Sequence, residues 1–130
     1  MTSDDKAASL EGASPVGERR PLTATLDNGL VVVYEAMPWL PSVTANLVLP
    51  FGSASDPQGL EGTATVLHEW LQRGAGDMDS RALSDALEDL GVRRGGGASR
   101  ESSNLSMSFL ASELEAVMPL LAAMVVSPRL

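Results

Sequence analysis

The sequence predicts an α+β domain with helices packed on one face of a mostly antiparallel sheet, in the order β-β-β-α-α-β-β-α. Three observations predict this class. An Asn28-Gly29 pair separates two short apolar runs near the start of the chain. After Leu60 the apolar residues change to the 3.6-residue spacing of a helix, and an alternating run at residues 103–110 precedes a last helical stretch.

The first three predicted elements are strands. Residues 22–26 and 30–35 flank Asp27-Asn28-Gly29, and an Asn-Gly pair tolerates the positive φ angles of a tight hairpin. Residues 42–50 alternate well enough to form a third strand. The Gly, Ser, Asp and Pro residues of 51–59 then predict a loop.

A helix is predicted from Leu60 to about Arg73, ended by Gly74 and Gly76. Its apolar residues fall on one stripe, which we expect to be buried: Leu60, Ala64, Leu67 and Leu71. Its polar residues fall on the opposite face, which we expect to be solvated: Thr65, His68, Glu69 and Gln72.

Two further helices and two further strands complete the pattern. One helix runs from Asp79 or Ser80 to Leu90, and another begins at Ser112, where Glu115 would complete a capping box. Pro119 should kink that last helix or delay its start. Residues 103–110 predict a strand, whereas 92–99 predict a weak strand at best, because three consecutive glycines contribute no side chains to packing.

Composition excludes several classes of function. The chain has 130 residues and a net charge of −8, which argues against binding to nucleic acid or to an anionic membrane. It has no cysteine, which excludes disulfides and cysteine-based zinc sites, and one histidine, His68, which excludes a metal site with two imidazoles from this chain.

The chain is expected to comprise a disordered leader at residues 1–20 and one domain at residues 21–130. The leader mixes small and charged residues and has no apolar stretch that would mark a secretory signal. The longest apolar stretches, residues 30–33 and 120–126, are shorter than the roughly 20 residues that span a bilayer. A cytoplasmic protein is therefore expected.

Thr65, His68 and Glu69 are the one arrangement in the sequence that could carry chemistry. Helix positions i, i+3 and i+4 share a face, so these side chains could form a metal or acid–base cluster. They could equally be the solvated face of an amphipathic helix, and the periodicity favours this second interpretation.

Several short motifs occur in order along the chain: Leu26–Leu30, Gly52-Ser53, Gly59–Ala64, Leu87–Gly91 and Ser99–Glu101. With these motifs, residues 21–130 resemble part of a domain of the pitrilysin/insulinase metallopeptidases, the inverzincin family. The resemblance implies an inverted zinc motif, H-x-x-E-H, on the helix that follows Gly62. In that motif two histidines hold zinc and the glutamate activates water.

The resemblance places Thr65, His68 and Glu69 at the first histidine, the glutamate and the second histidine of this motif, so all three positions differ. Thr65 offers only a neutral hydroxyl, and if His68 and Glu69 bound zinc, no carboxylate would remain to take a proton from the water. We therefore expect no catalytic residue, no metal ligand and no cofactor. The family's substrate-edge segment corresponds to Gly95, Gly96, Gly97 and Ala98.

The sequence thus predicts a non-catalytic half-domain, a structural partner or truncated homologue of a zinc peptidase subunit. Expected partners are a second copy, a zinc-bearing homologous subunit or unfolded peptides. One alternative is a zinc-dependent metalloendopeptidase with a rearranged site that uses His68, Glu69 and ligands from another chain. The other is a dimerisation or peptide-binding module that pairs through a free sheet edge.

Overall fold

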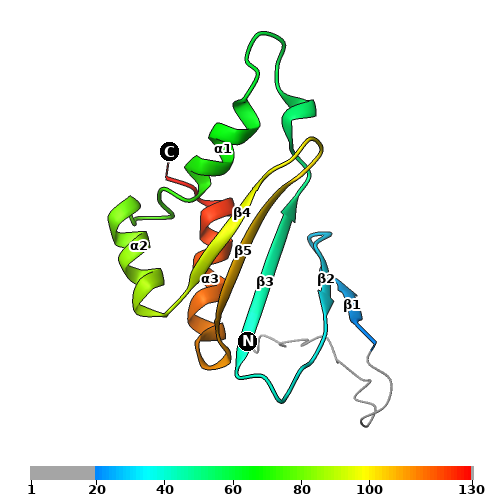
Figure 1. Ribbon diagram of the computed structural model, residues 1–130, viewed down its shortest axis with the longest axis vertical. Coiled ribbons are helices and arrows are strands. Elements are labelled where there is room, and N and C mark those ends of the chain that lie inside the picture. Colours follow the sequence, from blue (N-terminus) through cyan, green and yellow to red (C-terminus); the bar gives the residue numbers. More distant parts are fainter. Residues whose placement is uncertain (1–19, 130) are drawn as a thin grey trace, which may run out of the picture. The chain divides into compact units, whose positions relative to one another are not determined.

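The computed structural model describes residues 20–129, which form five strands and three α-helices (Figure 1). The element order is the predicted β-β-β-α-α-β-β-α, and the predicted α+β class is confirmed. The chain divides into two compact units between Pro38 and Trp39, which are described separately. The predicted leader, residues 1–20, lies outside the described residues except for Arg20.

The first unit contains the predicted hairpin. Strands β1 (Leu22–Thr25) and β2 (Val31–Tyr34) are antiparallel, with Leu22 opposite Tyr34. The turn between them is closed by Asn28, whose side-chain oxygen accepts the Leu30 N–H at 3.1 Å, and by Gly29, which adopts a φ of 84°. These are the two turn residues whose chemistry predicted the hairpin.

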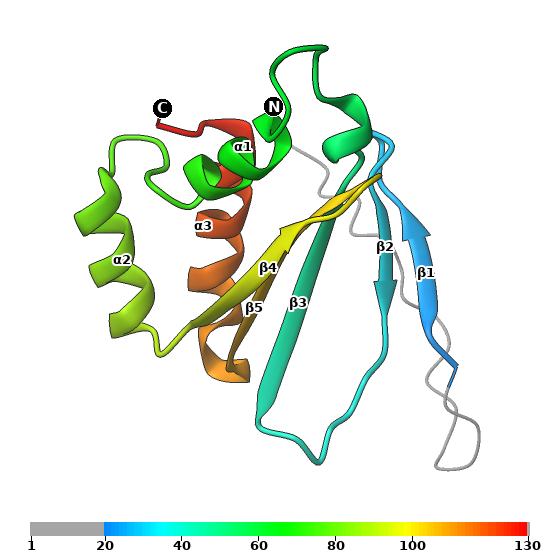
Figure 2. The same cartoon turned by 45° about the horizontal axis from the view of Figure 1, so that its top comes forward.

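The second unit contains a three-stranded antiparallel sheet in the order β3-β5-β4 (Figure 2). Its strands are β3 (Ser42–Leu49), β4 (Arg93–Ala98) and β5 (Ser103–Leu110). The central strand β5 alternates strictly, and one face of it is fully buried: Ser103, Leu105, Met107 and Phe109. The opposite face of the sheet is polar, and there Thr44 and Ser108 are hydrogen-bonded at 3.0 Å.

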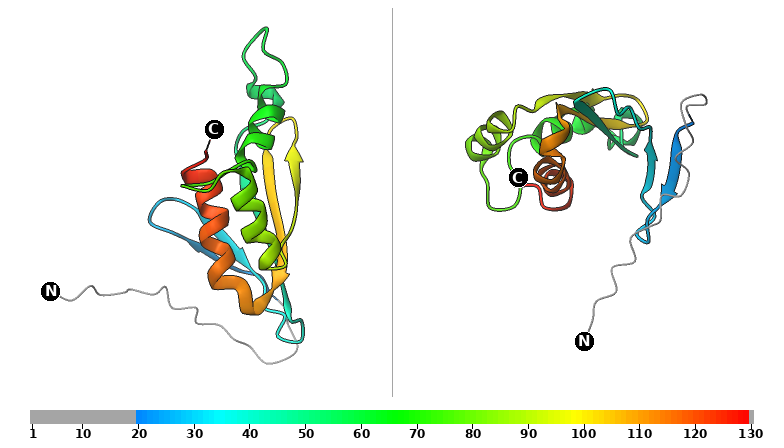
Figure 3. Two further views of the ribbon diagram at one scale, coloured as in Figure 1. Left: turned by 90° about the vertical axis from the view of Figure 1, so that its left-hand side faces the viewer. Right: turned by 90° about the horizontal axis from the view of Figure 1, so that it is seen from below.

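Three helices cover the buried face of this sheet: α1 (Thr63–Leu71), α2 (Ser80–Asp89) and α3 (Leu114–Val126). Figure 3 shows α3 lying along that face. The core combines residues of α2, α3 and β5: Leu83, Leu87, Leu105, Met107, Phe109, Val117, Leu121 and Met124. None of the helices within residues 20–129 is long and apolar enough to cross a membrane.

The predicted start of α2 is confirmed, and that of α3 is corrected. Asp79 caps α2 by accepting the Ala82 N–H at 2.9 Å. The capping box predicted at Ser112 does not form, because the Ser112 hydroxyl donates instead to the Glu113 carboxylate at 2.9 Å. A 3₁₀ turn, η2 (Ala111–Glu113), precedes α3, which therefore starts two residues later than predicted and continues through Pro119.

Leu83→Ala should lower the free energy of unfolding by about 2–5 kcal/mol, because Leu83 is fully buried between α2 and the sheet. Val126→Ala, at a side chain that is 80% exposed, should change it by less than about 0.5 kcal/mol. Urea unfolding followed by circular dichroism measures both. Equal losses of unfolding free energy in the two variants would contradict the placement of Leu83 in the core.

Candidate functional site

The candidate site is built on α1 and on the neighbouring strand β4. The N-terminus of α1 is fixed by Asp56, which lies just after a 3₁₀ turn, η1 (Ser53–Ser55). The two carboxylate oxygens of Asp56 accept the N–H groups of Gly62 and Ala64, each at 2.7 Å. A carboxylate at this place satisfies unpaired helix N–H groups and interacts favourably with the helix dipole.

The rotation of α1 about its axis differs from the sequence prediction. Its buried residues are Ala64, His68 and Leu71, whereas Leu60 precedes the helix and is 62% exposed. His68 is only 3% exposed, so the prediction that it lies on the solvated face was wrong. The reason is a buried polar partner on β5, which a count of apolar residues on the helix does not detect.

His68 belongs to a hydrogen-bonded chain that joins α1 to β4 and β5. With the ring proton on Nδ1, Gln72 Nε2 donates to His68 Nε2 at 3.1 Å, and His68 Nδ1 donates to Ser103 Oγ at 2.8 Å. The Ser103 hydroxyl in turn donates to the carbonyl oxygen of Gly97 at 3.4 Å. Both ring nitrogens are thus paired, as a buried imidazole requires.

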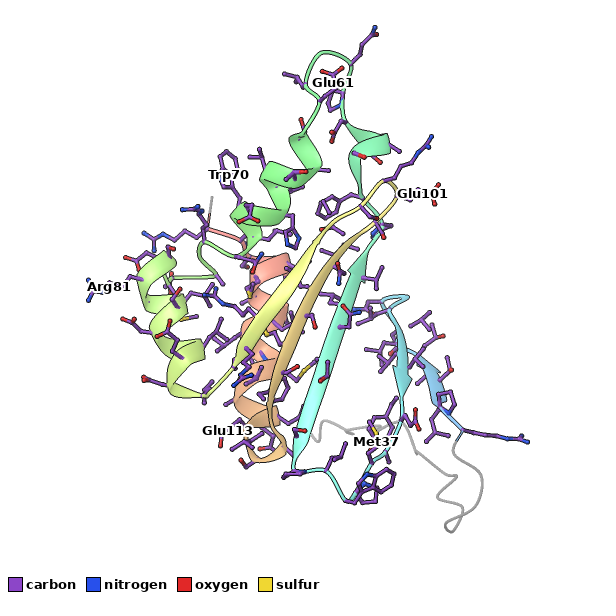
Figure 4. All side chains as sticks on the ribbon, viewed as in Figure 1. Met37, Glu61, Trp70, Arg81, Glu101 and Glu113 are labelled. Carbon is purple, nitrogen blue, oxygen red and sulfur yellow. The ribbon has the colours of Figure 1, made fainter. Side chains whose placement is uncertain are left out.

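The other two motif positions point elsewhere. Thr65 and Glu69 are exposed on α1, on the side of the helix that does not enter the core. Trp70 is also half exposed, and Figure 4 shows it projecting away from the sheet. The structure therefore separates the three candidate residues, with His68 turned inward and Thr65 and Glu69 turned outward.

The substrate-edge residues Gly95, Gly96, Gly97 and Ala98 lie on β4, at the edge of the sheet. The segment predicted to be a weak strand is a complete one, paired with β5 from Arg93 to Ala98. Gly96 has a φ of 128°, and a Cβ there would collide with the backbone of Asn104 across the ladder. At Gly95 and Gly97 a Cβ would meet nothing within 4 Å.

These donors do not fit a catalytic zinc ion. The Nε2 lone pair of His68 accepts from Gln72, its Nδ1 donates to Ser103, and Thr65 has only a neutral hydroxyl. Among residues 20–129, no group of three or more His, Cys, Asp or Glu side chains is placed to hold a metal ion. A catalytic zinc site needs about three protein ligands and an open position for water.

Comparison with known proteins identifies the family. The family described as Insulinase (Peptidase family M16) matches residues 31–130. The chain belongs to this peptidase family. The match confirms the resemblance to the pitrilysin/insulinase metallopeptidases that the sequence motifs indicated. No curated protein sequence is detectably similar to the chain.

Two solved structures share the fold of this M16 family member. A protease from Helicobacter pylori has a TM-score of 0.79 and 18% identity, over 87% of this chain and 27% of that one. A peptidase M16 inactive domain from Pseudomonas fluorescens has a TM-score of 0.72 and 24% identity, over 84% of this chain and 27% of that one. The chain thus spans 27% of the length of either structure.

His68→Ala should lower the free energy of unfolding by about 2–4 kcal/mol, because it leaves Ser103 and Gln72 without their partner in a buried cavity. Glu69→Ala, at the next residue but on the exposed side of α1, is the matched control and should cost less than about 0.5 kcal/mol. Urea unfolding distinguishes the two. A neutral effect of His68→Ala would mean that His68 faces solvent.

Gly96→Ala should destabilise the M16 domain by about 2 kcal/mol or more, because alanine is strained at this φ and its Cβ meets the Asn104 backbone. Gly95→Ala should change the free energy of unfolding by less than about 1 kcal/mol, because the space around it is open. Thermal unfolding of both variants is the measurement. If Gly95→Ala proved the more damaging, the conformation assigned to β4 would be incorrect.

Proposed function

We propose that this chain is a non-catalytic M16 module whose strand β4 contacts extended peptide, while a zinc-bearing homologous subunit carries out hydrolysis. One observation carries the proposal. The residue at the position of the motif glutamate, His68, is used inside the fold and is not available to zinc or to water.

The remaining donors on α1 support the same conclusion. Thr65 and Glu69 are one helical turn apart and both exposed, so they could meet above the helix surface. A hydroxyl and a carboxylate make at most two ligands, and the hydroxyl is a poor one for zinc. If Glu69 bound the metal, no second carboxylate among the described residues is placed with it to accept a proton from water.

The likeness to a solved M16 domain described as inactive is consistent with this proposal. The two proteins share 24% identity, so the likeness concerns the fold, and the loss of activity is proposed here from the residues of α1. The zinc-bearing partner and a homo-oligomeric alternative both stay predictions, as does the cytoplasmic location.

The position of β4 supports the peptide-contacting part of the proposal. Among the described residues, β4 pairs with β5 on one side and with no strand on the other. An edge strand presents unpaired N–H and C=O groups, which bind an extended peptide by adding it as a further strand. The alternative of a dimerisation module would use the same edge, with a second copy as the added strand.

Calorimetric titration of the purified chain with zinc chloride should give no saturable site. The alternative, a zinc peptidase with a rearranged site, requires a site that is lost both in His68→Ala and in Glu69→Gln. Glu88→Gln removes an exposed carboxylate of α2 and serves as the control, because it should leave any such site intact. A saturable site with that pattern, together with zinc-dependent cleavage of a quenched fluorogenic peptide, would overturn the non-catalytic proposal.

A further inference from the structure

We infer that the free edge of β4 selects extended peptides that carry carboxylate side chains. This inference rests on the proposed peptide-contacting role of β4 and adds the chemical class of the peptide. It is carried by Arg93 and Arg94 at the start of the strand, by Arg73 after the end of α1, and by the open space along the glycines that follow.

Two of these arginines lie on opposite faces of the edge strand. Arg94 pairs with Met107 and therefore lies on the face that the helices cover, whereas Arg93 pairs with Ser108 and lies on the polar open face. The side chains of a strand added beside β4 would point alternately to these two faces. A carboxylate of the added strand beside Arg93 or Arg94 would therefore meet a guanidinium on either face of the sheet.

The guanidinium of Arg94 is held in place from the helix side. One of its NH groups donates to the carbonyl oxygen of Gln72 at 3.4 Å and the other to Ser84 Oγ at 3.1 Å. Both partners are neutral, so the positive charge of Arg94 is not neutralised by them. A guanidinium with five N–H donors retains donors for a carboxylate when two are used in this way.

Arg73 follows Gln72, whose carbonyl oxygen accepts from Arg94, so the backbone of a third arginine lies near the Arg94 guanidinium. Within residues 20–129, neither Arg73 nor Arg93 nor Arg94 forms an ion pair with a carboxylate, whereas Arg81 on α2 pairs with Asp85. The chain as a whole carries a net charge of −8, whereas this group of unpaired arginines is locally positive. Such a local charge favours an acidic ligand over a basic one.

The glycines provide the room that the added strand needs. Gly95 and Gly96 are exposed, and the space beside Gly95 and Gly97 is empty to 4 Å from an ideal Cβ. A peptide strand beside these residues meets no side chain of β4, so large apolar residues can occupy that stretch. The expected ligand is thus an extended segment with apolar residues and an adjacent cluster of Glu or Asp.

The test uses two fluorescein-labelled peptides with blocked ends, each of alternating valine and threonine. One ends in three glutamates and the other in three lysines. Fluorescence anisotropy measures their affinity for the full chain, and amide hydrogen exchange measures protection of β4. The glutamate peptide should bind at least about fivefold more tightly than the lysine peptide, and high salt should remove most of the difference.

The variant that tests the arginines is the double substitution Arg73→Gln and Arg93→Gln. Both side chains are exposed and lack carboxylate partners among the described residues, so the variant should fold with little change in its melting temperature. Its affinity for the glutamate peptide should be about fivefold lower, and its affinity for the lysine peptide should not fall. Arg100→Gln, in the turn beyond the other end of β4, is the control and should change neither affinity.

The outcomes separate the two proposals. Equal protection of β4 amides by both peptides, unaffected by the double variant, would overturn the acidic preference and leave the peptide-contacting role standing. A lack of protection of β4 by either peptide would overturn both. Preference for the glutamate peptide with protection outside β4 would place the acidic site elsewhere and also contradict the inference.

Discussion

The hydrogen-bonded chain from Gln72 through His68 and Ser103 to Gly97 is the constraint on which the candidate site depends. A buried imidazole is costly unless both of its nitrogens find partners, and here those partners lie on α1 itself and on the sheet. Any rotation of α1 about its axis would break the bond from His68 to Ser103, which is the bond that joins the helix to the sheet. These hydrogen bonds therefore fix which residues of α1 face the core and which face outward.

The same chain of hydrogen bonds helps to explain why β4 forms a strand although it contains three consecutive glycines. Glycine loses more backbone entropy on folding than other residues and supplies no side chain for packing. Strand β4 is nevertheless held along its whole length by β5, and its Gly97 carbonyl is bonded by Ser103 beneath α1. The Gly97 N–H also donates to the side-chain oxygen of Asn104 at 3.2 Å. Backbone pairing and side-chain bonds from β5 thus replace the packing that the glycines lack.

Elements with strong local signals could be predicted from the sequence, and positions decided by tertiary partners could not. The Asn28-Gly29 turn, the alternation of β5 and the start of α2 at Asp79 or Ser80 have local causes, and all three were predicted correctly. His68 was misplaced because its burial depends on Ser103, which is distant in the sequence. Ser103 did offer a signal, since it occupies a core position in an alternating strand and must have a buried partner there.

The inward position of His68 limits what chemistry α1 can support. A motif at positions i, i+3 and i+4 works only if all three side chains reach the same space, and here the middle one is 3% exposed while its neighbours face solvent. A histidine introduced at Thr65 would therefore face Glu69 alone, and the pair would still lack a base for the water. Among residues 20–129, no further side chain stands ready to complete a metal-binding group on this surface. The exposed side of α1 and the free edge of β4 therefore support the proposed binding role by their chemistry.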